Sequence, residues 1–331
     1  MFDRARRAAV VVALATLIGG CTKLFIVQNP DDVLIRVGDA AEFRRAADYA
    51  SSLVPYALLA GRAYDDLRAG ATEPEPALTA AALRSPEAAA WLARWRRVHW
   101  DFGPLACPAA DPDCRKLGGL AVQIWTRRGR VCGEAVIAFR GTDADSADDW
   151  LTNLRWVTRA LPLYDQYDQV RAHVGRLVGF VASLPCYREG VTRITAVGHS
   201  LGGGLAQQAA YADPRIRRVV AFDPSAVTGY YAVEPAARRH NERGLEIERV
   251  YEHGEVLAYL RLVMRVIYPL SACDPQIRTL RFEALKGSVV SQHSMDRVVE
   301  KLLSWAPAPP ADGRTPAMPA RTPIGCAPGP S

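Results

Sequence analysis

Apolar residues follow two different spacings along the chain, and the changes between them predict its elements. Short runs rich in branched residues and bounded by turn residues are typical of buried strands, whereas apolar residues three and four positions apart are typical of helices. We expect strands over 121–126, 134–139, 191–197, 217–222, 247–251 and 279–284. We expect helices over 40–67, with Pro55 kinking or dividing it, and over 88–100, 147–157, 163–184, 201–211, 255–267 and 294–305.

The order of these elements predicts the fold class. The first two strands flank an Arg-Arg-Gly-Arg turn and should form a hairpin. Beyond them strands alternate with helices, which is typical of a mostly parallel central sheet flanked by helices. We therefore predict a single α/β domain over residues 36–305. A tether over 21–35 should precede it, and a Pro- and Ala-rich tail of low regularity should follow over 306–331.

The first twenty residues have the pattern of an export signal. Three arginines precede a largely apolar run over 8–18, and two glycines then lead to Cys21. The Ile-Gly-Gly-Cys segment resembles a bacterial lipobox, which implies cleavage before Cys21 and lipid attachment to it. Thr22, where Asp would suggest inner-membrane retention, favours the outer membrane of the cell envelope. A plain secreted protein is the alternative.

Charge and hydropathy exclude two other classes. The 41 Lys and Arg residues against 35 Asp and Glu give a net charge of +6, and the arginines are spread along the chain. No clustered basic face is predicted, so we do not expect nucleic-acid binding. No internal apolar run of about 18 residues suggests a second membrane span.

Six cysteines remain once Cys21 is set aside, and an even number suits disulfides in an oxidising compartment. Their spacings do not suggest a zinc site. One pair brackets a short loop, one pair precedes two predicted strands, and one pair could tie down the tail. Six cysteines allow 15 pairings, and among them this placement suggests Cys107–Cys114, Cys132–Cys186 and Cys273–Cys326.

One pentapeptide indicates a nucleophile. Gly198-His-Ser-Leu-Gly202 fits the G-x-S-x-G pattern, with a predicted strand leading in and a predicted helix leaving. Gly198 and Gly202 leave room for a sharp turn that exposes the hydroxyl of Ser200. The backbone N–H of Leu201, at the helix N-terminus, would face an oxyanion. A glycine-rich turn that binds nothing is the alternative.

With this elbow the chain resembles the class 3 lipases, the branch of α/β-hydrolases that includes the fungal triacylglycerol lipases. Two further stretches carry the resemblance across residues 40–305. Residues 135–156, AVIAFRGTDADSADDWLTNLRW, resemble the family's strand ending in F-R-G-[ST]. Residues 249–260, RVYEHGEVLAYL, resemble the strand and loop that carry its acid. The resemblance implies an α/β-hydrolase fold and hydrolysis of acylglycerol or phospholipid esters without a metal or organic cofactor.

The resemblance also implies residue roles. Ser200 matches the nucleophile, and Thr142 matches the residue that helps Leu201 to form the oxyanion hole. His293 matches the base, because it follows the last strand and opens a helix. The other histidines precede Ser200, lie inside the elbow, stand in a polar segment or lie too close to the acid. Residues 143–164 match the family's lid, or form an amphipathic helix that faces the core.

The acid is the point at which this chain departs from the family. The family has Asp where this chain has Glu255, and Glu can also accept from an imidazole Nδ1–H. Asp223, at the end of the strand after the nucleophile, is the other candidate, or only a turn residue before proline.

Three functions follow from these motifs. The first is a Ser-His-acid hydrolase of lipid esters that is anchored to a membrane. The second is a short-chain esterase or thioesterase. The third is a non-catalytic envelope lipoprotein that uses the fold for binding.

Overall fold

The computed structural model describes residues 28–38, 40–64, 82–99, 120–141, 166–257, 261, 271–311 and 315–320. Nine strands form one sheet in the order β2-β1-β9-β8-β7-β6-β5-β4-β3. Strands β5 to β9 are parallel, and two antiparallel strands extend the sheet at each edge. The strands are β1 Asp32–Val37, β2 Ala40–Arg45, β3 Trp95–Val98, β4 Val122–Arg127, β5 Glu134–Phe139, β6 Arg193–His199, β7 Ile216–Phe222, β8 Glu246–Glu252 and β9 Gln276–Phe282.

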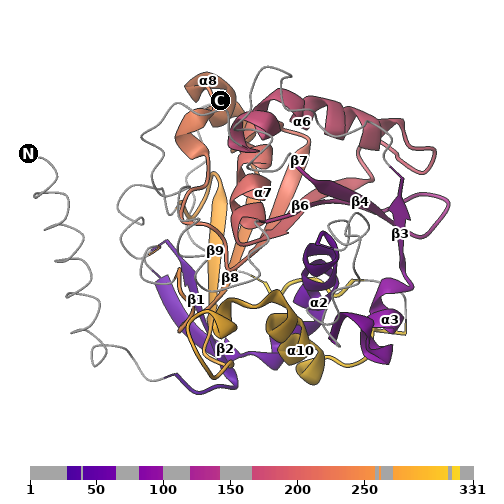
Figure 1. The fold of residues 1–331 in the computed structure, drawn as a ribbon. Helices are drawn as coiled ribbons and strands as arrows, with labels where there is room; N and C mark the ends of the chain where they lie inside the picture. The colour runs from indigo at the N-terminus through magenta and orange to yellow at the C-terminus, as the bar shows by residue number, and fades with distance from the viewer. Residues whose placement is uncertain are drawn as a thin grey trace, which may run out of the picture.

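Helices cover both faces of the sheet (Figure 1). Helices α2 and α10 pack on one face and α6 and α7 on the other, with α3 beside α2 and α8 beside α7. Their bounds are α2 Ala47–Arg62, α3 Pro86–Leu92, α6 Gln166–Ser183, α7 Leu201–Ala212, α8 Pro235–Asn241 and α10 Met295–Trp305. Short 3₁₀ turns are η2 Ala82–Arg84, η4 Tyr230–Ala232 and η5 Ser291–His293. The predicted α/β fold with a mostly parallel sheet is confirmed.

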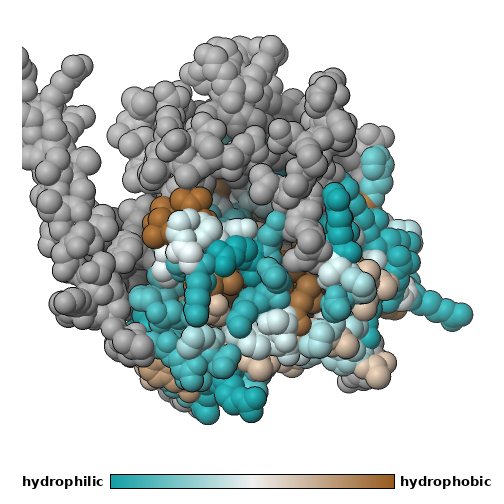
Figure 2. All heavy atoms as spheres, turned by 60° about the horizontal axis from the view of Figure 1, so that its bottom comes forward, coloured by the Kyte–Doolittle hydropathy of each residue, from teal (hydrophilic) through white to brown (hydrophobic). Residues whose placement is uncertain are grey.

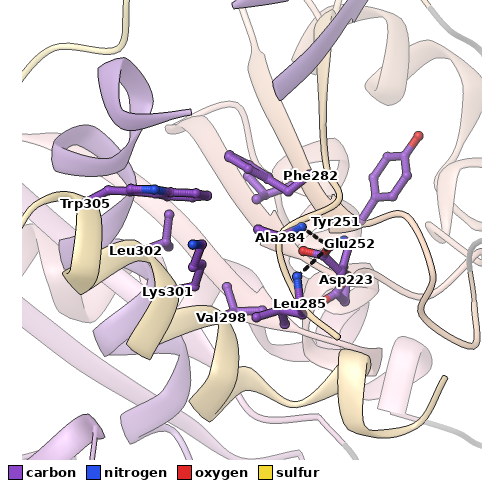
Figure 3. A pocket seen from close by; sticks show the side chains of 11 residues that line it. Asp223, Tyr251, Glu252, Phe282, Ala284, Leu285, Val298, Lys301, Leu302 and Trp305 are labelled. Atoms are coloured by element: carbon purple, nitrogen blue, oxygen red, sulfur yellow. Dashed lines mark hydrogen bonds between the residues drawn. The ribbon is translucent and has the colours of Figure 1, made fainter. Parts of the chain in front are cut away.

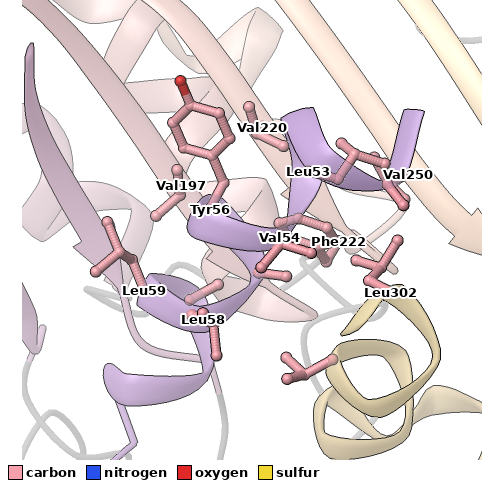
Figure 4. Packing of buried hydrophobic residues seen from close by; sticks show 14 of the residues in the cluster. Leu53, Val54, Tyr56, Leu58, Leu59, Val197, Val220, Phe222, Val250 and Leu302 are labelled. Carbon is pink, nitrogen blue, oxygen red and sulfur yellow. The ribbon is translucent and has the colours of Figure 1, made fainter. Parts of the chain in front are cut away.

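The parallel strands are apolar on both faces because each face is covered. In β7, Val220 and Phe222 pack into the cluster under α2 and α10, whereas Val219 and Ala221 pack under α6 and α7. Figure 4 shows the first cluster, where Leu53 and other α2 side chains meet the sheet. Each fully buried Leu, Val or Phe side chain contributes about 1.5–3 kcal/mol. The sheet that carries the site is therefore held from both sides.

Helix α10 has one buried face and one polar face. Val299, Leu302 and Leu303 are buried, whereas Glu300 is exposed. Figure 2 looks onto this side of the molecule, and its described surface is mostly hydrophilic. No helix in the described part of the chain has the length and apolar character needed to cross a membrane.

The N-terminal segment differs from the prediction. Residues 40–45, expected to begin a helix, form β2, and the helix α2 begins only at Ala47. Residues 32–35, expected in the tether, belong to β1, which pairs with both β2 and β9. Strand pairing here overrides the helical composition of 40–45. Pro55 does not divide α2, which continues through it to Arg62.

A second correction concerns the predicted helix over 88–100. The helix α3 ends at Leu92, and Trp95 begins the edge strand β3, which pairs with β4. Trp91 and Trp95 are both buried in the core. The large apolar side chains were therefore a sound guide to burial but not to the element that carries them.

The C-terminal segment lacks helix and strand in its described residues, as predicted, but it packs against the domain. The indole Nε1 of Trp91 donates to the carbonyl oxygen of Ala306 at 3.2 Å. Nη1 of Arg278, whose side chain also forms a buried ion pair with Glu248, donates to the carbonyl oxygen of Pro319 at 2.8 Å. Backbone carbonyls of this segment thus satisfy buried donors of the core.

The predicted disulfide Cys132–Cys186 is present, and its cysteines precede β5 and β6 at one end of the sheet. Cys273 is disulfide-bonded as well. The other predictions on cysteines, including lipidation of Cys21, fall on residues outside the described ranges. The same holds for the helix over 147–157, the lid over 143–164 and most of the helix over 255–267.

Candidate active site

The elbow between β6 and α7 places Ser200 in a strained backbone conformation. Its φ of 55° lies in the left-handed region, which residues other than glycine rarely adopt. A Cβ atom on Gly198 would lie 2.2 Å from the carbonyl oxygen of Gly202, and one on Gly202 would lie 2.2 Å from that of Phe139. Only glycine fits at either position, so the turn is as tight as the sequence pattern predicted.

Backbone hydrogen bonds hold the strained turn in place. The N–H of Ser200 donates to the carbonyl oxygen of Phe222 at 3.0 Å, and the carbonyl oxygen of Ser200 accepts from Ser225 at 2.8 Å. Leu201 is the first residue of α7, directly after Ser200. Strain of this kind persists only where the surroundings determine it, and it is typical of functional sites.

His293 and Glu255 meet at the C-terminal side of the sheet. Glu255 lies in the turn after β8, and His293 lies in η5, after β9 and before α10. Nδ1 of His293 donates to Oε2 of Glu255 at 2.7 Å. Because a carboxylate can only accept, the proton of the neutral ring is on Nδ1, and Nε2 carries the lone pair. This tautomer is the one that a general base in a serine hydrolase needs.

Glu255 is fully buried, yet its surroundings favour the charged form. Burial by itself would raise the pKa of Glu255, but the ion pair with Arg261 and the hydrogen bond from His293 lower it below its ordinary value. The N–H of Leu257 also donates to Oε2 at 2.8 Å. Arg261 is held in turn by the carbonyl oxygen of Pro224 at 2.8 Å.

Asp223, the other candidate acid, lies nearby but is bound differently. It follows β7 with a φ of 38°, and its Oδ1 accepts from the N–H of Glu252 at 2.9 Å. In the described part of the chain Oδ2 has no hydrogen-bond partner. Burial first, and then the charge of Glu255, raise the pKa of Asp223 well above its ordinary value.

A nitrogen of His199, a nitrogen of His293 and a carboxylate oxygen of Asp223 lie within 4.8 Å of one another. These are metal-ligand types, and they form the one such cluster among the described residues. Both ring nitrogens of His199 are already hydrogen-bonded, and Nδ1 of His293 is bound to Glu255. A metal at this cluster would have to break one of the two bonds of His199, whereas Nε2 of His293 could bind it with the Glu255 bond intact. His199 is therefore not arranged to serve as a ligand.

A pocket lined in part by Asp223 and Glu252 lies between the ends of β8 and β9 and the helix α10 (Figure 3). Apolar side chains such as Phe282, Leu302 and Trp305 form most of its wall. The carboxylate of Glu252 accepts from the N–H groups of Ala284 and Leu285 there. Burial raises the pKa of Glu252 to about 7.

Ser200 and Leu201 follow β6, Glu255 follows β8 and His293 follows β9. All four thus lie at the C-terminal ends of the parallel strands, and His293 is hydrogen-bonded to Glu255 there. Thr142 lies outside the described residues. Its neighbour Gly141 runs beside the elbow, since a Cβ atom on it would lie 2.7 Å from the carbonyl oxygen of His199. The sequence did not predict that Arg261 pairs with Glu255. The only signal was that Arg261 lies in the segment after Glu255.

Comparison with known proteins gives a family. Residues 56–269 match the family model of the Tle-like phospholipase domain. Among solved structures, the lipase from Rhizopus microsporus var. chinensis is 13% identical, with a TM-score of 0.40 over 68% of this chain and 71% of that one. Lipase II from Rhizopus niveus is 14% identical, with a TM-score of 0.39 over 69% and 77%. No curated protein matches the sequence.

Proposed function

Because the chain belongs to the Tle-like phospholipase domain family, we propose that it is a serine hydrolase that cleaves the acyl esters of phospholipids. The observation that carries the proposal is the 2.7 Å hydrogen bond between His293 and Glu255, at the same end of the sheet as the strained elbow of Ser200. A buried carboxylate that fixes an imidazole beside such an elbow suits acyl transfer. The phospholipid class rests on the family.

In the proposed reaction Nε2 of His293 removes the proton from the hydroxyl of Ser200 as its oxygen attacks the ester carbonyl carbon. The carbonyl π electrons move to oxygen. The N–H of Leu201, together with the hydroxyl and backbone N–H of Thr142, stabilises that oxyanion. Each such donor accounts for about 10²–10³ in rate. The imidazolium of His293 then protonates the leaving lysophospholipid oxygen, which leaves an acyl ester on Ser200.

The second half of the reaction returns the enzyme to its starting state. His293 takes a proton from a water molecule, whose oxygen attacks the acyl carbon. As the ester bond to Ser200 breaks, the imidazolium of His293 returns that proton to Oγ of Ser200 and the fatty acid is released. Glu255 remains ionised throughout, because Arg261 and the N–H of Leu257 stabilise its charge. Its role is to keep the proton on Nδ1 and to stabilise the imidazolium.

The test is hydrolysis of phosphatidylcholine vesicles, with fatty acid and lysophospholipid measured by mass spectrometry. We expect equal amounts of both products from the wild type and none from Ser200→Ala. A butyrate ester and an acyl-CoA, tested in parallel, separate the alternatives. Cleavage of either with no action on vesicles would contradict the phospholipid class and favour a short-chain esterase or a thioesterase.

A comparison of dissolved and aggregated substrate tests residues 143–164 as a lid. If these residues form the lid that the resemblance implies, rather than a helix that faces the core, the rate should rise sharply when a short-chain phospholipid passes its critical micelle concentration. Equal rates per molecule of dissolved and micellar substrate would contradict the lid hypothesis.

We also propose that the mature chain is anchored to the cell envelope through a lipid on Cys21, where its substrate is abundant. Several acyl chains give firm anchoring, because each buried CH₂ contributes about 0.8 kcal/mol. Expression in a bacterium with radiolabelled palmitate should label the wild type and not Cys21→Ser. Label on neither protein, with the wild type in the soluble fraction, would indicate plain secretion.

A further inference from the structure

His199 is a buried side chain that the proposed reaction does not use. It ends β6, directly before Ser200, and only 7% of its surface is exposed. The elbow needs glycine at 198 and 202 for space, as the close contacts there show. Nothing in the backbone geometry requires a histidine at 199, so its ring calls for another explanation.

The hydrogen bonds of His199 join two parts of the site. Its Nε2 lies 2.8 Å from the backbone carbonyl oxygen of His293, and the hydroxyl of Tyr64 lies 3.1 Å from its Nδ1. A carbonyl oxygen only accepts, so Nε2 carries the proton and Nδ1 accepts from the Tyr64 hydroxyl. The rings of His199 and His293 lie 4.8 Å apart at an angle of 42°.

His199 stays neutral while it makes these bonds. Burial first, and then the neighbouring His293, hold the pKa of His199 well below its ordinary value. One neutral tautomer satisfies both of its partners. His199 therefore does not compete with His293 for the proton of the nucleophile.

The segment before His293 runs over the surface, and the helix α10 that follows it begins with the buried Met295. Residues 286–289 are exposed, and Val289 is 47% exposed. One hydrogen bond joins this segment to the turn that carries Glu255: the N–H of Val256 donates to the carbonyl oxygen of Val289 at 3.2 Å. The side chain of His293 is held by Glu255, but that bond orients the ring and does not fix the ring's distance from β6.

We propose that His199 is a positioning residue: its Nε2–H fixes the backbone of His293 to the end of β6, and so sets the distance between the base and Ser200. This inference rests on the proposed function. A misplacement of about 1 Å in a catalytic group can cost roughly 10²-fold in rate. The bond spans 94 positions in the sequence and joins the base directly to the strand of the nucleophile.

The test compares two amides at position 199. In His199→Gln the side-chain N–H reaches about as far as Nε2 of the imidazole, whereas His199→Asn is shorter by one methylene and cannot reach the carbonyl of His293. We expect kcat on vesicles to fall about tenfold or more in His199→Asn, with KM unchanged. In His199→Gln it should stay within about threefold of the wild type. His240→Asn, on an exposed part of α8, is the matched control and should not change kcat.

A merely structural role would give a different result. Both amides remove the ring, so both would then lower the melting temperature and lose activity together. Equal losses of kcat in the two variants, or full activity in His199→Asn, would overturn the positioning role. If His199→Asn does not fold, His199→Phe takes its place, because phenylalanine is close in size to histidine but has no donor.

Labelling with a fluorophosphonate separates this inference from the proposed function. A wild type that labels at Ser200 and cleaves vesicles, together with a fully active His199→Asn, overturns only the positioning role. A wild type that neither labels nor hydrolyses overturns the proposed function, and the positioning role with it.

Discussion

Glu255 and Asp223 are two buried acids that follow neighbouring strands, and they have opposite surroundings. Glu255 accepts from His293 and Leu257 and pairs with Arg261. Asp223 accepts one backbone N–H, and its second oxygen has no hydrogen-bond partner among the described residues. The pKa of Glu255 is lowered and that of Asp223 is raised, although neither side chain is exposed by more than 1%.

The difference teaches that burial does not decide which acid is charged. Burial raises the pKa of any carboxyl, and only cations and N–H donors reverse that effect. Glu255 has these partners, so it can stabilise an imidazolium without taking up its proton. Asp223 is neutral over a wider pH range, and it is therefore the poorer partner for the base.

The largest expected effect comes from Glu255→Gln. The amide can donate to Nδ1 of His293 and so favour the wrong tautomer of the ring. We expect kcat on phospholipid vesicles to fall by about 10³–10⁴, with the circular dichroism spectrum unchanged. Glu255→Asp, which keeps a carboxylate on a side chain shorter by one methylene, should recover part of the loss. A fall of less than tenfold in Glu255→Gln would contradict the assignment of Glu255, rather than Asp223, as the acid that supports His293.

The next effect concerns the cation that keeps Glu255 ionised. Without Arg261 the pKa of Glu255 should rise, because burial is then less opposed. A protonated Glu255 cannot accept from Nδ1 of His293. The activity of Arg261→Gln relative to the wild type should therefore be lower at pH 5 than at pH 8. A ratio that is constant across this range would show that Arg261 does not control the charge of Glu255.

A smaller effect on activity is expected for Asp223→Asn. We expect kcat to stay within about tenfold of the wild type, since Asp223 does not hold the proton-bearing nitrogen of His293. Its effect on stability should depend on pH. The raised pKa of Asp223 favours the folded state below the pKa of the unfolded chain, and that contribution is lost as the pH rises through the folded value.

Thermal unfolding measures this dependence. The melting temperature of Asp223→Asn, relative to the wild type, should be higher at pH 8 than at pH 4. A difference of the opposite sign would mean that Asp223 is ionised in the folded protein, and it would return Asp223 to the list of candidate acids.

The smallest effect on activity is expected from the Cys132–Cys186 disulfide, which lies at the opposite end of β6 from Ser200. Its removal in Cys132→Ser/Cys186→Ser should lower the free energy of unfolding by about 2–4 kcal/mol. The kcat at 25 °C should not change, because the elbow is held by its own backbone bonds. If kcat also falls in this variant, the lower kcat of Glu255→Gln could be explained by lost stability of the fold rather than by the lost charge of Glu255.

The sequence predicted more of the fold than of the electrostatics. Short runs of branched apolar residues predicted the parallel strands, and apolar residues three and four positions apart predicted the helices α6, α7 and α10, because burial imposes those patterns. The strand β2 was missed, since its six residues have a helical composition and are placed by pairing with β1. Edge strands are specified by their partner more than by their own residues.

At the site, the motif predicted the elbow, and the resemblance predicted that Glu255 and His293 belong together. The choice between Glu255 and Asp223 stayed open in the sequence, because it depends on groups that folding brings in. Arg261 stands six positions beyond Glu255, and its guanidinium is fixed by the carbonyl oxygen of Pro224. The contact of Tyr64 with His199 joins positions 135 apart and leaves no local pattern.

Reaction with a fluorophosphonate, followed by intact mass and peptide mapping, is the decisive measurement. We predict one adduct per chain on the peptide that contains Ser200, none on Ser200→Ala, and slower labelling in Glu255→Gln than in Asp223→Asn. An unlabelled wild type, or an adduct that persists in Ser200→Ala, would contradict the assignment of Ser200 as the nucleophile.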